Sequence, residues 1–336
     1  MASQEQTVIE EVKKRKKNMS TIRIPDLVPS PSEDCEKLNN AFNGLGTDEK
    51  VIVRILGRRN AIQRRKIRET YQQLYNKSLI GSIFDELSGD FRKAVMLWTY
   101  EPAERDARLA NEALNSKRKS ITQLQIIVEI ACATSPHHLV AVRQSYCSLF
   151  GSSLEEDIIS NVPLPVQKIL VSLVRSYRYD KEVVDTNIAD MEAAKLYMAT
   201  MAKKLDDDEL VRILSTRNVF QLRETFKCYK DTFGKFMDQD IMACGKGLFE
   251  SIMKVVIWCL HTPEKHFAEV VRAAIIGLGT DEDSLTRAIV SRAEIDMMKV
   301  RGAYFEANKS SMDNSVIGDT SGDYKDFLMT LLGANV

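Results

Sequence analysis

Hydrophobic side chains recur along this chain with the period of an α-helix. In the segments 91–98, 249–256 and 324–331, apolar positions follow the i, i+3, i+4, i+7 spacing that places them on one helical face. They are Phe91, Ala94, Val95 and Trp98, then Phe249, Ile252, Met253 and Val256, and finally Tyr324, Phe327, Leu328 and Leu331. Residues 51–56 and 63–74 also have a helical pattern, and no run alternates convincingly like a strand. The pattern predicts an all-α chain with recurring core-facing helices.

A unit of roughly 70 to 80 residues occurs four times in the chain. The stretch Gly-Leu-Gly-Thr-Asp-Glu at 44–49 recurs at 277–282, and Ser-Gly-Asp at 88–90 recurs at 321–323, both 233 positions later. A second copy lies at an offset of 75, where Tyr146 corresponds to Tyr71. A third lies at an offset near 160, where Trp258 corresponds to Trp98. These matches predict four homologous repeats at 31–102, 103–177, 187–262 and 263–336.

The segments outside the repeats are polar. Residues 1–30 are interpreted as an N-terminal tail, in which a basic cluster at 13–17 precedes Pro25 and Pro29. This cluster is either solvated or a contact for anionic lipid, where each basic residue would contribute about 1 kcal/mol near the surface. Residues 178–190 are interpreted as a polar connector between the second and third repeats.

The composition excludes several classes of function. The 336 residues include 47 basic and 47 acidic side chains, so the charge excess typical of nucleic-acid-binding proteins is absent. No apolar run approaches the roughly 20 residues that span a bilayer, and the first residues do not form the apolar core of a signal peptide. The six cysteines and four histidines lack zinc-ligand spacing. We therefore expect a cytoplasmic protein with free thiols.

Two glycine-rich loops each precede a carboxylate by the same distance. Glu86 lies 40 residues after Gly46, and Asp319 lies 40 residues after Gly279. Glycine allows a tight loop to turn its carbonyl oxygens toward one point, and Ca²⁺ prefers oxygen ligands that include carboxylates. Two such pairings at one offset predict two calcium sites.

The same loops also read as the starts of helices. Thr47 and Thr280 are good N-cap residues, and acids follow each of them in the next turn. The two interpretations are compatible, because a capped helix would hold the loop rigid. Leu45 and Leu278 lie at the loop apices, where they would either dip into a lipid interface or pack inward.

The four-unit period, the Gly-x-Gly-Thr loops and the offset-matched acids resemble the annexin family over residues 31–336. The resemblance implies an all-α fold of four five-helix repeats packed into a curved disc, with Ca²⁺ sites on the convex face. The implied ligands are three backbone carbonyls and one carboxylate in each site: Phe42, Gly44, Gly46 and Glu86 in the first repeat, and Ile275, Gly277, Gly279 and Asp319 in the fourth. Weaker auxiliary sites are implied at Thr47 with Glu49 and at Thr280 with Glu282.

The two middle repeats depart from this pattern. At the offset of 75, the loop of the second repeat falls on 115–120, which reads Asn-Ser-Lys-Arg-Lys-Ser, and the acid position is Asn161. In the third repeat the loop region is 201–206, and the acid position is Cys244. Keeping only the outer two ligand sets is similar to plant annexins. The basic residues 117–119 are either solvated or a calcium-independent contact for lipid headgroups, and the acids at 206–208 are interpreted as charges at a helix N-terminus.

The resemblance implies calcium-dependent binding to anionic, phosphatidylserine-like membranes, with a peripheral location there when calcium rises. A helical-repeat scaffold that ignores calcium is the alternative. The family also implies channel or peroxidase-like activity, but no Walker A loop or catalytic triad stands out, so we expect no enzyme. The pair Cys132 and Cys259 and the triplet at 22–24 are similar to a redox pair and an actin-binding motif of the family. Redox control, actin binding and self-association stay open.

Overall fold

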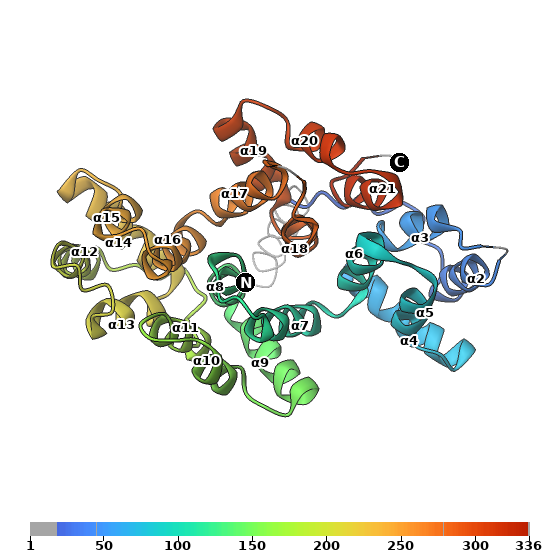
Figure 1. Cartoon of the computed structure of the whole chain (residues 1–336), viewed down its shortest axis with the longest axis horizontal. Helices are drawn as coiled ribbons and strands as arrows, with labels where there is room; N and C mark the ends of the chain where they lie inside the picture. The colour runs from blue at the N-terminus through green and yellow to red at the C-terminus, as the bar shows by residue number, and fades with distance from the viewer. Residues whose placement is uncertain (1–18, 45, 278, 335–336) are drawn as a thin grey trace, which may run out of the picture. The chain divides into compact units, whose positions relative to one another are not determined.

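The structure, a computed structural model, describes residues 19–44, 46–277 and 279–334. This part of the chain contains 20 α-helices and no strand, with five helices in each of the four repeats (Figure 1). The prediction of an all-α fold of four five-helix repeats is confirmed. The basic cluster at 13–17 lies outside the described residues.

Every repeat has the same order of helices, and its fourth helix always has eight residues. The first repeat consists of α2 (Pro31–Phe42), α3 (Glu49–Leu56), α4 (Ala61–Tyr75), α5 (Leu79–Glu86) and α6 (Gly89–Thr99). The second consists of α7 (Pro102–Asn115), α8 (Ile121–Cys132), α9 (Pro136–Phe150), α10 (Leu154–Asn161) and α11 (Val166–Arg175). The third consists of α12 (Thr186–Met201), α13 (Asp208–Thr216), α14 (Val219–Phe233), α15 (Met237–Cys244) and α16 (Leu248–His261). The fourth consists of α17 (Pro263–Ile275), α18 (Glu282–Arg292), α19 (Met297–Asn308), α20 (Met312–Asp319) and α21 (Gly322–Leu331).

The chain divides into two compact units. One comprises residues 1–102 and 267–336 and holds repeats 1 and 4, while the other comprises 103–266 and holds repeats 2 and 3. In the first unit, α6 packs against α18 and α21, and α3 packs against α21. In the second, α8 packs against α16, and α11 against α13. Both glycine loops therefore belong to one unit.

The helical faces predicted from the sequence form the core. All four predicted positions of α6 and of α21 are buried, and so are three of the four on α16, where Phe249 is half-buried. Within the first unit, the rings of Phe91 and Phe327 meet edge to face at 6.0 Å. The indole N–H of Trp98 donates to the carbonyl oxygen of Leu56 at 2.8 Å, so this buried polar group is satisfied.

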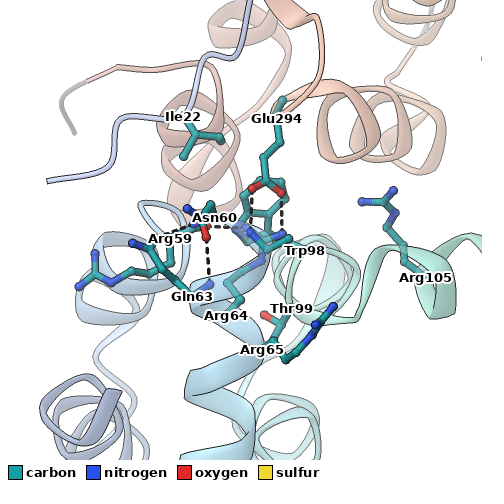
Figure 2. Close-up of polar contacts among 12 residues, drawn as sticks. Ile22, Arg59, Asn60, Gln63, Arg64, Arg65, Trp98, Thr99, Arg105 and Glu294 are labelled. Carbon is teal, nitrogen blue, oxygen red and sulfur yellow. Dashed lines mark hydrogen bonds and ion pairs between the residues drawn. The ribbon is translucent and has the colours of Figure 1, made fainter. Parts of the chain in front are cut away.

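A buried arginine joins repeat 1 to repeat 4 in the first unit. The guanidinium of Arg64 pairs with the Glu294 carboxylate at 2.9 Å and lies 3.6 Å from the ring centroid of Trp98 (Figure 2). The other oxygen of Glu294 accepts the backbone N–H of Ala61 at 2.8 Å, at the start of α4. Because Glu294 stands between α18 and α19, this contact fixes α4 relative to the fourth repeat.

The described part of the tail belongs to the same unit. Thr21 donates its backbone N–H to the carbonyl oxygen of Ala293 at 3.0 Å and its hydroxyl to that of Leu331 at 2.6 Å. The carbonyl oxygen of Met19 accepts the N–H of Met298 at 3.0 Å. Residues 19–21 are therefore part of the fold.

The connector after the second repeat is shorter than its sequence indicates. Arg178 is buried, and its guanidinium donates to the carbonyl oxygens of Leu214 at 2.5 Å and Arg217 at 2.6 Å, at the end of α13. Asp185 caps α12 by accepting the N–H of Ile188 at 3.1 Å. The prediction of a connector over 178–190 is therefore wrong from Asp185 onward, because a polar residue there caps a helix.

Candidate metal centre

Glycine determines the backbone of both loops. The φ angles of Gly46, Gly277 and Gly279 are 88°, 147° and 96°, a region that side chains rarely permit. A Cβ on Gly44 would lie 3.0 Å from the carbonyl oxygen of Gly46. A side chain at position 44 would therefore crowd this oxygen, so the close approach requires glycine.

One backbone hydrogen bond closes each loop. The N–H of Asp48 donates to the carbonyl oxygen of Ala41 at 3.0 Å, and the N–H of Asp281 donates to that of Ala274 at 2.7 Å. These pairs are related by the offset of 233 found in the sequence. The repeated motif thus has the same local closure in both copies.

The helix caps lie one residue later than predicted. Asp48 and Asp281 each accept the backbone N–H three residues ahead, at 3.1 and 3.0 Å, and so cap α3 and α18. The prediction that Thr47 and Thr280 are the N-caps is wrong, because their hydroxyls are used elsewhere.

These threonines connect each loop to the end of the short fourth helix. The Thr47 hydroxyl lies 3.4 Å from both the carbonyl oxygen and a carboxylate oxygen of Glu86, the last residue of α5. The Thr280 hydroxyl donates to the carbonyl oxygen of Asp319, the last residue of α20, at 3.1 Å. The structure therefore brings each predicted acid to its glycine loop across about 40 residues of chain.

Acids from both repeats line a single hollow of about 360 Å³ in the first unit. They include the predicted acids of both sites and two further aspartates: Glu49, Glu86, Asp90, Glu282, Asp319 and Asp323. Asp90 and Asp323 were not predicted as site residues, although both lie in the repeated Ser-Gly-Asp motif. This motif could have indicated both aspartates as site residues, since it recurs at the same offset as the glycine loops.

A tyrosine beside this hollow has a raised pKa, mainly because it is buried. Tyr324 lines the hollow, and its hydroxyl donates to the carbonyl oxygen of Glu282 at 3.2 Å. Burial raises the pKa of Tyr324; a hydrogen bond with Thr286 opposes the shift, while the charges of Asp90, Glu282 and Asp283 add to it. Tyr324 therefore stays neutral at physiological pH.

The donor chemistry fits a hard cation. Among the described residues, no three His, Cys, Asp or Glu side chains form a group that could hold a metal. A site here must therefore be completed by carbonyl oxygens, which the positive-φ glycines make available. Carbonyl and carboxylate oxygens are what Ca²⁺ prefers. The apex residues Leu45 and Leu278 lie outside the described residues.

The second repeat has its loop in a different register from the one predicted. Tyr71 donates to the side-chain oxygen of Asn39 at 3.3 Å, and Tyr146 accepts from the side chain of Asn111 at 3.1 Å. The two asparagines lie 72 positions apart, whereas the tyrosines lie 75 apart. At this offset the counterpart of the glycine loop at 44–49 is 116–121, so the assignment of the loop to 115–120 is wrong by one residue. The offset of 75 itself is wrong by three residues in this part of the repeat.

The third repeat has no comparable site. The thiol of Cys244 donates to the carbonyl oxygens of Thr200 and Asp240, each at 3.3 Å. Asp207 accepts the N–H groups of Glu209 and Leu210 at 2.9 and 3.2 Å and so caps α13. The prediction that the acids at 206–208 serve a helix N-terminus agrees with this cap.

The two cysteines singled out in the sequence are buried in the second unit. Neither Cys132 nor Cys259 is in a disulfide, and both have almost no exposed surface. Burial raises the pKa of Cys132 to about 11, and Arg178 offsets only part of that shift. A thiol in this environment is protonated at neutral pH and a poor nucleophile.

Comparisons with known proteins give a consistent result. The family model described as Annexin matches residues 33–98, 105–173, 191–256 and 266–331. The chain is 57% identical to Annexin D3 of Arabidopsis thaliana over 321 residues, which is 95% of this chain and 100% of that protein. Among solved structures, annexin III superposes with a TM-score of 0.86 at 30% identity, covering 94% of this chain and 97% of its own. Calcium-bound annexin (Sm)1 superposes with a TM-score of 0.82 at 26% identity, covering 94% and 93%.

Proposed function

Because this chain belongs to the annexin family, which implies calcium-dependent phospholipid binding, we propose that it binds anionic membranes through Ca²⁺ held in repeats 1 and 4. One observation carries the proposal. In two places, a threonine hydroxyl connects a glycine loop to the end of the helix that supplies an acid. Repeats 2 and 3 have Asn161 and Cys244 at the acid position and lack the glycines.

The proposed ligands are backbone carbonyls and one carboxylate in each site. They are Phe42, Gly44, Gly46 and Glu86 in repeat 1, and Ile275, Gly277, Gly279 and Asp319 in repeat 4, with Thr47, Glu49, Thr280 and Glu282 as auxiliary ligands. When bound, Ca²⁺ would join these oxygens to a lipid phosphate, because three carbonyls and one carboxylate leave it short of its usual six to eight oxygens.

We expect each site to bind Ca²⁺ weakly in the absence of lipid. Each site offers one formal negative charge from its main carboxylate, and that carboxylate is exposed to solvent. The lipid phosphate supplies the missing oxygen, so lipid and calcium must strengthen each other's binding by the same factor. Two sites in one unit add avidity when both engage one bilayer.

The acidic hollow supports attraction of divalent cations. Six carboxylates around about 360 Å³ give this part of the surface a negative potential. Such a potential raises the local concentration of cations and falls steeply with ionic strength. Calcium binding should therefore weaken as salt rises.

The test removes one carboxylate from each site. We predict that Glu86→Gln with Asp319→Asn abolishes calcium-dependent cosedimentation with phosphatidylserine vesicles, because amides cannot replace the lost charge. Helical circular dichroism should be unchanged, since both side chains are exposed at helix ends.

A matched control removes the same charges elsewhere in the first unit. Glu36→Gln with Asp26→Asn alters two exposed acids that do not line the hollow. This control should cosediment like the wild type. Calcium-dependent binding that survives in the Glu86 and Asp319 variant would refute the assignment of the sites.

The remaining features agree with peripheral binding. Among the described residues, no helix combines the length and apolar character that crossing a bilayer requires. Annexins associate peripherally with membranes and are generally not enzymes. We propose the same here, with a cytoplasmic protein that reaches the membrane surface when calcium rises.

A further inference from the structure

In repeat 2, the ammonium group of Lys119 contacts the backbone of its own loop. The Nζ atom of Lys119 donates to the carbonyl oxygen of Leu114 and, at 2.5 Å, to that of Ser116. Leu114 lies in the last turn of α7, and Ser116 follows the helix directly. The side chain therefore folds back onto the backbone of its own loop.

The carbonyls that Lys119 contacts correspond to two proposed calcium ligands. The offset of 72, given by the equivalent contacts of Asn39 and Asn111, relates Leu114 to Phe42 and Ser116 to Gly44. In repeat 2 the ammonium thus bonds to the two backbone carbonyls that are equivalent to proposed Ca²⁺ ligands of repeat 1.

The acid position has changed together with the loop. Asn161 is the last residue of α10, as Glu86 is of α5, and its amide donates to the carbonyl oxygen of Asp157 at 2.9 Å. A calcium ion with one carboxylate carries a net charge of about +1, by the formal charges of the groups. An ammonium with a neutral amide carries the same net charge.

We propose that the repeat 2 loop binds the phosphate of anionic membrane lipids without calcium, with Lys119 as its built-in cation. The inference rests on the proposed membrane function and extends it to a repeat that lacks the calcium ligands. An ammonium has three N–H donors, and two of them are used by the loop carbonyls. The third can bond to a phosphate oxygen.

The charge of the loop identifies a lipid surface as the occupant. Lys117 and Arg118 precede Lys119 and are exposed, and the stretch 115–120 contains no acid. Clustered basic residues are attracted to anionic bilayers, with each charge contributing to binding. Lys117 and Arg118 supply this diffuse attraction, whereas Lys119 makes the directed contact.

Cosedimentation with phosphatidylserine vesicles in EGTA tests the proposal on the full chain. Lys119→Ala should weaken calcium-independent binding about tenfold or more, because a positioned, charge-assisted hydrogen bond is lost. Lys117→Ala removes an equal charge from the same loop and should weaken binding only about fivefold. Lys119→Met keeps the alkyl chain in place and should behave like Lys119→Ala. An equal loss of binding in both variants would then come from the missing ammonium and not from a folding defect.

Three results would overturn the proposal. The first is that the wild type fails to bind vesicles in EGTA. The second is that the Lys117 and Lys119 variants lose binding equally. The third is that millimolar inorganic phosphate alone displaces the protein from the vesicles. The last result would mean a site for free phosphate. The calcium sites and the Lys119 site fail separately. The Glu86→Gln, Asp319→Asn variant should lose calcium-dependent binding and still bind vesicles in EGTA, whereas Lys119→Ala should lose the binding seen in EGTA.

Discussion

At the residue scale, glycine determines whether a loop can present its carbonyl oxygens. Gly279 has a φ of 96°, and nothing lies within 4 Å of the position where a Cβ would stand. A side chain there would meet no neighbour, so the constraint is the backbone conformation itself. For other residues this conformation costs about 1–2 kcal/mol.

Replacing Gly279 should therefore weaken the repeat 4 site. In a Glu86→Gln background, in which only repeat 4 is intact, Gly279→Ala should raise the calcium concentration for half-maximal vesicle binding about tenfold. Gly302→Ala is the control, because Gly302 is exposed within α19 and has open space around it. An unchanged calcium requirement for Gly279→Ala would mean that this carbonyl is not a ligand.

Some of these residue roles could be predicted from the sequence, and others could not. The glycines and the two acids followed from the repeated spacing. The choice between Thr47 and Asp48 as N-cap did not, because both are good capping residues. Only the tertiary contact of Thr47 with Glu86, on a helix 39 residues away, decides it.

At the scale of elements, the contact of Arg64 with Glu294 connects α4 to the segment between α18 and α19 (Figure 2). The Arg64 side chain has 1% of its surface exposed, and that of Glu294 has 24%. A charge that is buried this deeply depends on its partner, because solvent cannot replace the lost carboxylate.

We predict that Glu294→Ala lowers the free energy of unfolding by about 3 kcal/mol, because it removes the partner of a buried guanidinium. Glu294→Gln should cost less, since its amide oxygen can still accept the N–H of Ala61. Urea unfolding measures both. The control Lys227→Ala removes an exposed lysine that pairs with the half-buried Glu224, and it should hardly change stability. Equal stability of Glu294→Ala and the wild type would contradict this role.

At the scale of the whole molecule, the four-repeat all-α fold followed from the helical period, but the register of the second loop did not. The offset of 75 was set by Tyr146 on α9 and does not hold for α7, where Asn111 gives 72. The stretch at 115–120 has no glycine to mark its alignment. The role of Lys119 could therefore be recognised only in the folded structure, and not from the sequence.

The division into two units predicts where calcium acts. Because both proposed sites belong to the unit of residues 1–102 and 267–336, millimolar calcium should slow amide hydrogen exchange at 46–52 and 279–285. The loop at 114–120, which Lys119 already closes, should exchange at the same rate with and without calcium. Protection of 114–120 by calcium would contradict the assignment. Exchange measured by mass spectrometry gives both rates in one experiment.

The most direct measurement is the anomalous difference density of a crystal soaked in calcium. We predict ions at the carbonyls of repeat 1 beside Glu86 and at those of repeat 4 beside Asp319. In repeat 2, the Lys119 ammonium should remain on the carbonyls of Leu114 and Ser116. Density in repeat 2, or none beside Glu86 and Asp319 at saturating calcium, would contradict the account.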